Sequence, residues 1–395
     1  MPRQLWLLLI GLMINVTGSS FLWPLNTIYI HDHLGKSLSV AGLVLMLNSG
    51  ATIIGNVVGG FLFDKIGSYK TIVTGGMIVL SAAIGLVLLH DWPYYILFLV
   101  VLGFGGGLVF PAMYAMAGSI WPSGGRKAFD AVYVAQNLGV AVGSALGGFI
   151  ASFSFTFIFI GNAAVYLVFF LLVVFTFKGI STIPIKREKI ETSTERKINK
   201  GMISLFILTI GYAFCWFAYV QWQSTISSYT QTLGIPLDLY SLLWTVNGAL
   251  IVFGQPIVSV LAGKMFKSIK TQIIFGICIF ILSFIVVSQA TVFQGFLISM
   301  IIITIGEMFV WPAIPTIANQ LAPPGKVGMY QGFVNGTASF GRMFGPLVGG
   351  IVVDHYGMSA AFLVVIILLI VAIFTTVFYD KATTSKEKQK GNVAM

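Results

Sequence analysis

Long apolar segments separated by short polar turns run through the whole chain. A segment of about twenty apolar residues, wound as a helix, spans a hydrocarbon core about 30 Å thick. Segments of this kind occur twelve times, at 5–30, 38–63, 70–90, 94–118, 128–152, 156–177, 202–228, 239–262, 271–290, 293–318, 328–352 and 358–379. The pattern therefore predicts twelve transmembrane helices. The first apolar run continues to Ile30, beyond the roughly 7–15 apolar residues of a signal peptide, so we expect an uncleaved first helix.

One long polar stretch, from Lys178 to Lys200, separates six apolar segments from the other six. Of the 395 residues, 57% are hydrophobic and 9% are charged, whereas about a quarter of the residues in a soluble domain are charged. We expect an all-α membrane protein with an N-terminal six-helix bundle at 1–177, a cytoplasmic linker at 178–201, a C-terminal six-helix bundle at 202–379 and a cytoplasmic tail at 380–395.

Positive charges gather in every second turn. If both termini are cytoplasmic, twenty of the 22 lysine and arginine residues lie on the cytoplasmic side, and this asymmetry sets the orientation of membrane proteins. We therefore expect a multi-pass protein of the cell (plasma) membrane with both termini in the cytoplasm. Topology accounts for the net charge of +10, so nucleic acid is not an expected partner, whereas membrane lipids are.

The two halves carry matching residues at nearly constant spacing. Asn48 corresponds to Asn247 at a spacing of 199, and the run GSALGG from Gly143 corresponds to GPLVGG from Gly345 at a spacing of 202. Parallel six-helix repeats are the architecture of carriers that rock about a substrate site near the membrane midplane.

The turn after the second segment, GGFLFDKIGSYK from Gly59, resembles the GxLaDrxGrk motif of the major facilitator superfamily. The resemblance covers nearly the full chain and implies the major facilitator fold, with twelve transmembrane helices in two six-helix bundles. A carboxylate at Asp64 can lie against the N-terminus of helix 11, where the helix dipole favours negative charge, and release it as the halves rock. We expect a gating motif of Gly60, Asp64, Gly67 and Lys70, although Lys70 comes one position late. A solvated turn is the alternative.

Two further stretches resemble the LmrP-like multidrug transporters of the drug:proton antiporter group: RKAFDAVYVAQNLGVAVGSALGG from Arg126 and GEMFVWPAIPTIANQLAPPGKVGMYQG from Gly306. The resemblance implies that Glu307 lies in a central cavity and handles protons and cations. The chain departs from these relatives in helix 5, where Val132 replaces an Asp, and in carrying Arg342. Both departures count against strongly cationic substrates.

Glu307 and Arg342 are the leading site candidates because each is an ionisable residue near the middle of an apolar segment. A charge at that depth costs about 2.5–3.5 kcal/mol on insertion scales, so such residues usually face the protein interior or water and mark ion paths. We expect Glu307 to exchange a proton as its surroundings alternate between wet and dry, with Arg342 as an intermittent partner. The alternatives are a permanent ion pair, a neutral acid that fixes helix 10 against helix 11, and an Arg342 that only balances charge.

In this superfamily helices 1, 4, 7 and 10 line the cavity, and here they carry aromatic and amide side chains. Flat rings bury large areas of lipophilic ligands and stack on cations. The candidate substrate-binding residues on these helices are Trp23, Asn26, Phe110, Tyr114, Trp216, Tyr219, Gln223 and Trp311, to which helices 2 and 8 add Asn48 and Asn247. Packing or lipid contact by the aromatic residues, and interhelical hydrogen bonds by the two asparagines, are the alternatives.

The sequence contains no phosphate-binding loop GxxxxGK[ST] and no HExxH or GxSxG motif, which disfavours an ATP-driven pump and an enzyme. We expect no metal and no cofactor, with protons as the coupling ion. The main hypothesis is a monomeric multidrug antiporter that exports small lipophilic, often cationic, compounds by alternating access. A carrier for a specific metabolite, such as a sugar, a peptide or a lipid-like compound, by symport or antiport, is the alternative; a membrane-embedded enzyme or receptor ranks last.

Overall fold

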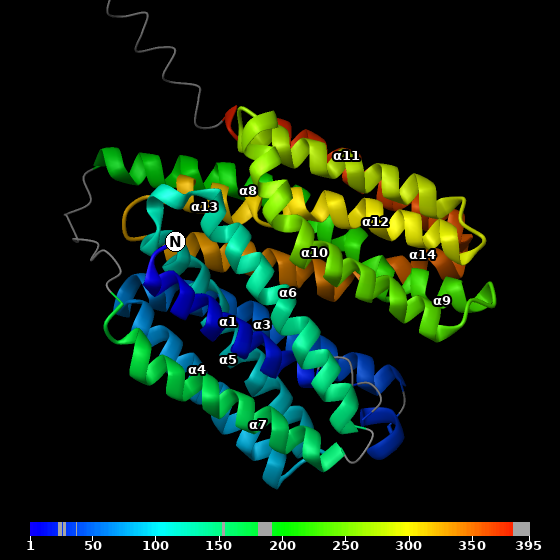
Figure 1. Ribbon diagram of the computed structural model, residues 1–395, viewed down its shortest axis with the longest axis horizontal. Helices are drawn as coiled ribbons and strands as arrows, with labels where there is room; N and C mark the ends of the chain where they lie inside the picture. The colour runs from blue at the N-terminus through cyan, green and yellow to red at the C-terminus, as the bar shows by residue number, and fades with distance from the viewer. Residues whose placement is uncertain (23–25, 27–28, 37, 152–154, 181–191, 382–395) are drawn as a thin grey trace, which may run out of the picture. The chain divides into compact units, whose positions relative to one another are not determined.

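The computed structural model describes residues 1–22, 26, 29–36, 38–151, 155–180 and 192–381 (Figure 1). The chain divides into two compact units: unit 1 comprises Met1–Pro184 and Lys326–Ser339, and unit 2 comprises Ile185–Gly325 and Phe340–Met395. The predicted bundles assign the segment Lys326–Ser339 to the C-terminal half, whereas in the structure it packs with unit 1.

Unit 1 consists of long helices that follow the predicted apolar segments. Its elements are α1 (Arg3–Leu22), η1 (Tyr29–His33), α3 (Leu38–Ile66), α4 (Ser68–Leu88), α5 (Tyr94–Ile120), η2 (Pro122–Gly124), α6 (Arg126–Ala151), α7 (Phe155–Leu172), η3 (Val173–Phe177) and the first part of α14 (Val327–Phe378). The most extensive packing joins α3 and α4 to α5, α1 to α6, and α7 to both α4 and α1.

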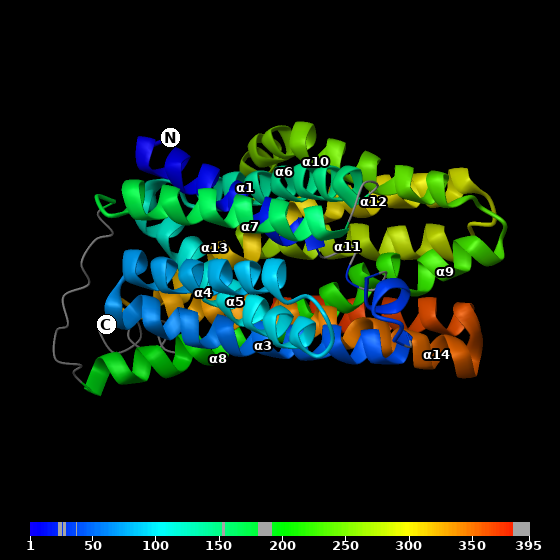
Figure 2. The same ribbon diagram turned by 90° about the horizontal axis from the view of Figure 1, so that it is seen from below.

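Unit 2 is also helical, and α11 runs beside α12 in both views (Figures 1 and 2). Its elements are α8 (Thr192–Val220), η4 (Gln221–Gln223), α9 (Thr225–Thr232), α10 (Leu237–Met265), α11 (Ile269–Ser288), α12 (Phe293–Val310), α13 (Ala313–Leu321) and the remainder of α14.

Each of the twelve predicted segments is helical over most of its described residues, which confirms the all-α membrane fold. By length and composition, ten helices in the described part of the chain can cross a membrane. The number is lower than twelve because α6 is not among them and because the last two predicted segments form the single helix α14. Non-helical angles at Gly357 (φ 81°, ψ 171°) mark the junction inside α14.

Helices approach one another closely at rows of glycines spaced four residues apart, which begin at Gly139 in α6 and at Gly341 in α14. In unit 1, a Cβ added at Gly139 of α6 would lie 2.6 Å from the Met13 carbonyl of α1. In unit 2, a Cβ added at Gly341 of α14 would lie 2.9 Å from the Ala213 carbonyl of α8. Small residues allow helix backbones to approach closely where lipid provides no hydrophobic driving force for association.

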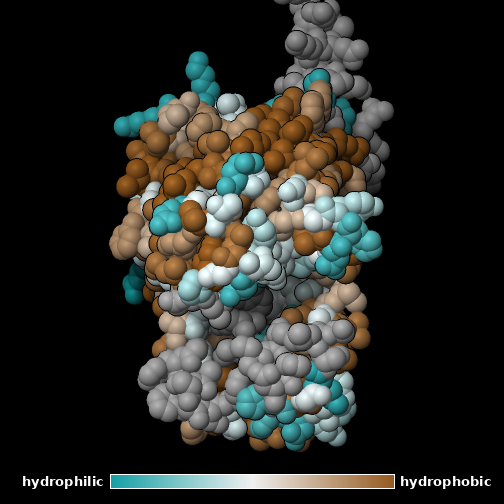
Figure 3. All heavy atoms as spheres, turned by 90° about the vertical axis from the view of Figure 1, so that its right-hand side faces the viewer, coloured by the Kyte–Doolittle hydropathy of each residue, from teal (hydrophilic) through white to brown (hydrophobic). Residues whose placement is uncertain are grey.

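Large apolar side chains lie on the surface as well as in the core. Leu8, Met113 and Phe169 are buried in the core of unit 1, whereas Phe175 and Phe253 are 78% and 77% exposed. Hydrophobic residues, drawn in brown, cover much of the upper part of the face in Figure 3, with hydrophilic residues in teal among them. Extensive apolar surface of this kind suits a lipid environment, and the protein is a multi-pass membrane protein.

Candidate functional site

The site in unit 2 lies where α12 ends at Val310, less than one helical turn after Glu307. Pro312 has no backbone N–H, so the carbonyl of Met308 loses its helical donor. The side-chain amide of Gln255 on α10 donates to this carbonyl at 3.3 Å, and the amide of Gln272 on α11 donates to the following carbonyl at 2.6 Å. Side chains from two neighbouring helices therefore satisfy the backbone at the point where α12 ends and α13 begins.

Glu307 is buried, with 1% of its surface exposed, and does not face lipid. One carboxylate oxygen accepts a hydrogen bond from the Trp311 indole N–H at 2.9 Å, and the other accepts from the side-chain amide of Asn247. The Asn247 amide also donates to the Thr304 hydroxyl at 2.9 Å, and the Tyr219 side chain interacts with both Glu307 and Asn247. Donors to both oxygens suit an ionised carboxylate, which only accepts hydrogen bonds.

Stacked indoles connect Glu307 to Arg342. The ring of Trp311 lies parallel to that of Trp216, with 4.6 Å between centroids and 12° between planes. The guanidinium carbon of Arg342 lies 4.6 Å from the centroid of Trp216, within the range of a cation–π interaction. Both ionisable residues predicted from the sequence thus belong to one group, which we call the Glu307 cluster: Glu307, Asn247, Trp311, Trp216, Tyr219 and Arg342.

The structure brings together four of the predicted substrate-binding residues, namely Trp216, Tyr219, Trp311 and Asn247, in this cluster. Gln223 is exposed on η4, one residue before a hydroxyl-lined cleft described below. Trp23 lies outside the described residues.

The remaining predicted residues belong to unit 1. Asn26 accepts a hydrogen bond from the Tyr95 hydroxyl at 2.7 Å, Tyr114 donates to the Gln136 side chain at 2.6 Å, and Asn48 donates to the Leu99 carbonyl at 2.5 Å. Phe110 packs against the apolar core. Asn48 therefore makes an interhelical hydrogen bond, the alternative that the sequence left open for it.

Three cluster neighbours were missed by the sequence reasoning. Tyr212 places its ring edge against Trp311, Trp244 does the same to Tyr219, and Thr304 accepts from Asn247. Their spacing could have identified them, because side chains three or four residues apart share a helix face: Tyr212 precedes Trp216 by four, and Trp244 and Thr304 precede Asn247 and Glu307 by three.

Val132, where the resembled transporters carry an Asp, is buried in the apolar core of unit 1. The nearby Asp130 binds Arg126 one helical turn away, at 3.2 Å. Asp130 therefore forms a local ion pair near the start of α6.

The predicted gating motif forms a helix cap. The two carboxylate oxygens of Asp64 accept the backbone N–H groups of Gly328 and Met329, the first turn of α14, at 2.9 and 2.8 Å. Gly60 lies so close to this turn that an added Cβ would overlap the Gly328 carbonyl. Gly67 has φ 86° and ψ 168°, a combination that only glycine adopts without strain. Lys70 is exposed.

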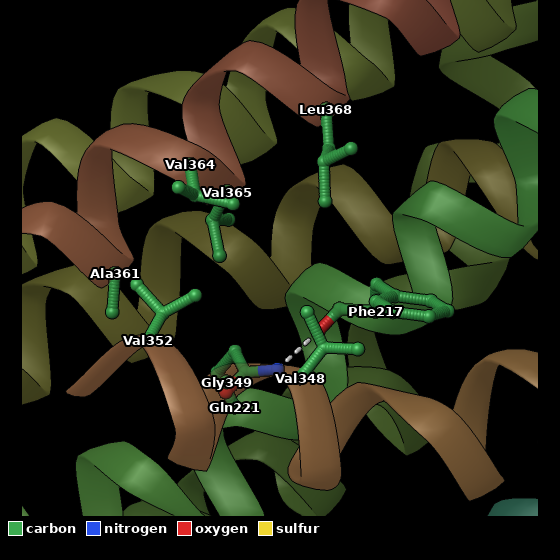
Figure 4. A pocket seen from close by; sticks show the side chains of 9 residues that line it. All are labelled: Phe217, Gln221, Val348, Gly349, Val352, Ala361, Val364, Val365 and Leu368. Atoms are coloured by element: carbon green, nitrogen blue, oxygen red, sulfur yellow. Dashed lines mark hydrogen bonds between the residues drawn. The ribbon is translucent and has the colours of Figure 1, made fainter. Parts of the chain in front are cut away.

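Among the described residues of unit 2, two of the hollows include neither Glu307 nor Arg342 in their lining. Figure 4 shows a mostly apolar cavity of about 20 Å³ where the Gln221 amide donates to the Phe217 carbonyl. It has room for a water molecule, whereas ligand pockets measure about 300–1,000 Å³. The second is a cleft of about 360 Å³ lined by Ser224, Ser228 and Tyr229 and by Asp354 of α14.

The profile of the Major Facilitator Superfamily matches residues 8–287 and 205–394. The chain belongs to this superfamily. It is 59% identical over 391 residues to the uncharacterized MFS-type transporter YttB of Bacillus subtilis (strain 168), a match that covers 99% of this chain and 98% of that protein. Both are transporters of the superfamily.

One more distant relative and one solved structure are also similar to the chain. The chain is 28% identical over 370 residues to the quinolone resistance protein NorA of Staphylococcus aureus (strain MRSA252), covering 90% of this chain and 91% of NorA. Its fold matches the crystal structure of the human organic anion transporter MFSD10 (TETRAN) with a TM-score of 0.77, covering 95% and 100% of the two chains at 14% identity. The second match concerns the fold alone.

Proposed function

We propose that this transporter exports lipophilic compounds in exchange for protons, as a multidrug antiporter of the drug:proton antiporter group with LmrP-like transporters as its nearest functional type. The observation that carries the proposal is Glu307, an acid with 1% of its surface exposed in a membrane-crossing helix, held by the side chains of Asn247 and Trp311. Buried acids at this depth are characteristic of proton pathways.

Protonation of Glu307 would change its neighbours. A neutral carboxyl group carries a donor O–H on one oxygen, so that oxygen no longer accepts as readily from Asn247 or Trp311. Because Trp311 is stacked on Trp216, loss of the Trp311 bond frees an indole of the aromatic group. Proton binding and the arrangement of the aromatic surface are therefore linked, which is the requirement for coupled exchange.

The aromatic composition of the cluster supports a lipophilic substrate. Trp216, Trp311 and Tyr219 place three rings within 5.7 Å of one another by centroid distance, and such rings bury large apolar areas of a ligand. NorA, a distant relative, is named for quinolone resistance. Export of quinolones by the present protein would fit the proposed class of lipophilic substrates.

We propose a gate at Asp64. Its hydrogen bonds to Gly328 and Met329 hold α3 to the start of α14, and alternating access would break and remake them. The protein would act as a monomer in the plasma membrane, with both termini in the cytoplasm, membrane lipids around it and no metal or organic cofactor.

Dye efflux from energised cells tests the proposal. Cells that express the wild-type protein should extrude a preloaded lipophilic dye, and an ionophore that collapses the proton gradient should stop the extrusion. Glu307→Gln should abolish uphill efflux because the amide cannot exchange a proton. Asp380→Asn, which removes a carboxylate bound to Lys270 at 2.8 Å outside the membrane-crossing segments, is the control and should transport normally. Proton-driven efflux by the Glu307→Gln variant would exclude Glu307 as the coupling residue.

A further inference from the structure

The cleft in unit 2 lies between one face of α9 and one face of α14 and has a volume of about 360 Å³. Ligand pockets measure about 300–1,000 Å³, so the cleft has room for a small organic molecule. Its lining residues on α9 are Thr225, Ser228, Tyr229 and Thr232. Their positions, i, i+3, i+4 and i+7, place them in one row along the helix. None of the described residues that line the cleft belongs to the Glu307 cluster, so the cleft is a separate candidate site.

The space in the cleft is open at Gly350 of α14, where an added Cβ would meet no atom within 4 Å. Val353, almost one helical turn later, lines the cleft with an apolar side chain. On α9 the Tyr229 ring is held by two aromatic neighbours, Phe296 and Phe362, with 6.3 Å between centroids in each pair. The apolar part of a ligand can therefore contact a fixed ring and an aliphatic side chain.

The charge of the cleft comes from Asp354, an exposed residue of α14. No lysine, arginine or histidine is among the described residues that line the cleft. Within the described part of the chain, the Asp354 carboxylate forms neither an ion pair nor a hydrogen bond. The cleft therefore presents a negative charge that is available to a ligand.

Three of the lining hydroxyl groups already donate their hydrogen atom within the chain. The hydroxyls of Ser224 and Thr232 donate to backbone carbonyls at 3.1 and 2.8 Å. The hydroxyl of Thr225 donates to the Gln221 side chain at 2.9 Å. Each of these oxygens keeps lone pairs that can only accept. Together with the carboxylate, they give the cleft a surplus of acceptors, which suits a ligand rich in donors.

The cleft lies at the end of unit 2 that is opposite the Lys270–Asp380 ion pair. Asp354 precedes the junction at Gly357 by three residues, and the rest of α14, residues 358–378, then runs towards Asp380. At 1.5 Å per residue this part of the helix is about 30 Å long. In the expected topology the cleft therefore opens outside the cell, where soluble compounds would reach it without crossing the membrane.

We propose that this cleft is a binding site for primary ammonium compounds that carry a short apolar group. The Asp354 carboxylate and the hydroxyl oxygens accept from the ammonium group, and Tyr229 and Val353 contact the apolar group. A primary ammonium has three donors and no acceptor, and its charge complements the carboxylate. A quaternary ammonium lacks the N–H groups, and a sugar lacks the charge. The site goes beyond the proposed export function and does not depend on Glu307.

Four probes test the ligand class: 2-phenylethylammonium, its trimethylammonium analogue, 2-phenylethanol and glucose. Binding is measured by saturation-transfer NMR with the purified full-length protein in phosphatidylcholine nanodiscs at pH 7, and the signal from empty nanodiscs is subtracted. An exposed ion pair corresponds to up to about fivefold in affinity. The wild-type protein should bind phenylethylammonium more tightly than phenylethanol by about this factor. It should bind the trimethyl analogue less tightly than phenylethylammonium and glucose weakest.

Two variants remove the charge and the space separately. Asp354→Asn should abolish the preference for phenylethylammonium over phenylethanol, because the amide is neutral. Gly350→Leu fills the open space and should weaken the binding of both compounds. Asp380→Asn removes a carboxylate at the other end of unit 2, and Gly263→Leu fills open space at a helical glycine of α10. These two controls should bind like the wild type. Thermal unfolding of each purified variant verifies its fold.

Several results would overturn the proposal. Equal affinity of the wild type for phenylethylammonium and phenylethanol would remove the charge recognition, and tightest binding of glucose or of the trimethyl analogue would assign the cleft to another class of ligand. An unchanged preference in Asp354→Asn would exclude the carboxylate. Loss of the preference in Asp354→Asn together with unaltered binding in Gly350→Leu would place the ammonium compound at the carboxylate but outside the cleft.

Discussion

Asn48 and Asn247 occupy matching positions in the two halves and bind different groups. Asn48 donates to a backbone carbonyl at Leu99, whereas Asn247 donates to Thr304 and to Glu307. The difference follows from the neighbouring helix: at the spacing of 201 that aligns Pro111 with Pro312, the residue that corresponds to Glu307 is Gly106. The presence of Glu307 therefore makes the Asn247 hydrogen bond part of the candidate site, whereas the equivalent bond of Asn48 only joins two helices.

Substitution of the two asparagines should have unequal effects. Asn247→Leu leaves a buried carboxylate without one donor and should cost about 1–3 kcal/mol of stability, whereas Asn48→Leu removes a neutral hydrogen bond worth about 0.5–1.5 kcal/mol. Proton-driven dye efflux should be lost in Asn247→Leu and retained in Asn48→Leu. Thermal unfolding in detergent and cell efflux assays measure the two effects. Similar behaviour of the variants would mean that Asn247 has a packing role only.

Gly67 and Gly357 end helices with almost the same backbone conformation, at φ 86°, ψ 168° and φ 81°, ψ 171°. Each follows an aspartate by three residues. A side chain at such angles costs about 1–3 kcal/mol, so Gly67→Ala should lower the midpoint of thermal unfolding. Gly42→Ala is the matched control: Gly42 is helical with open space around its Cα, and alanine there should stabilise the helix by up to about 1 kcal/mol. Equal melting temperatures for the two variants would argue against the strained turn.

At the scale of helices, the hydropathy pattern predicts which segments cross the membrane but does not predict where the individual helices within a segment begin and end. The segment 293–318 reads as one helix, but the structure divides it into α12 and α13 at Trp311 and Pro312. The segment 5–30 likewise contains elements of two kinds among its described residues, α1 (Arg3–Leu22) and the π-helix η1 (Tyr29–His33). Hydropathy measures side-chain transfer to lipid and does not register a missing backbone donor or a change of helix type.

The site residues were also predicted one by one and not as a group. Glu307 and Arg342 were identified because an isolated charge in an apolar run is conspicuous. Their connection through Trp216 and Trp311 depends on how α8, α12 and α14 are rotated about their axes. Packing sets that rotation, and an almost uniformly apolar helix has no polar face from which to infer it.

The cap that Asp64 forms on α14 should protect backbone amides. Asp64→Ala removes both acceptors of the Gly328 and Met329 N–H groups, so a peptide covering residues 326–332 should exchange hydrogen for deuterium faster than in the wild type. Asp130→Ala, which removes only the carboxylate bound to Arg126 in α6, should leave that peptide unchanged. Unaltered exchange in Asp64→Ala would show that water or another group satisfies these amides as well as the carboxylate does.

At the scale of the whole molecule, the distribution of positive charge, rather than the fold, decides which way the protein is oriented in the membrane. Lys264, Lys267 and Lys270 lie around the start of α11, and Lys270 binds Asp380, just beyond the end of α14, at 2.8 Å. The start of α11 and the end of α14 therefore lie at the same end of unit 2. Because positive charge is retained in the cytoplasm, this end should be cytoplasmic, and the chain terminus that follows Asp380 should be on the same side.

Labelling of two cysteines at opposite ends of α11 tests this orientation. Lys267 and Gln289 are both exposed and flank the helix Ile269–Ser288, which at 1.5 Å per residue is about 30 Å long. In a background without Cys215 and Cys278, Gln289→Cys should react with a membrane-impermeant maleimide in intact cells, and Lys267→Cys should react only after the cells are permeabilised. The opposite labelling pattern would mean that the protein has the inverted orientation in the membrane. The Asp64 cap, which the proposed topology places on the cytoplasmic side, would then lie outside the cell and could not serve as an inner gate.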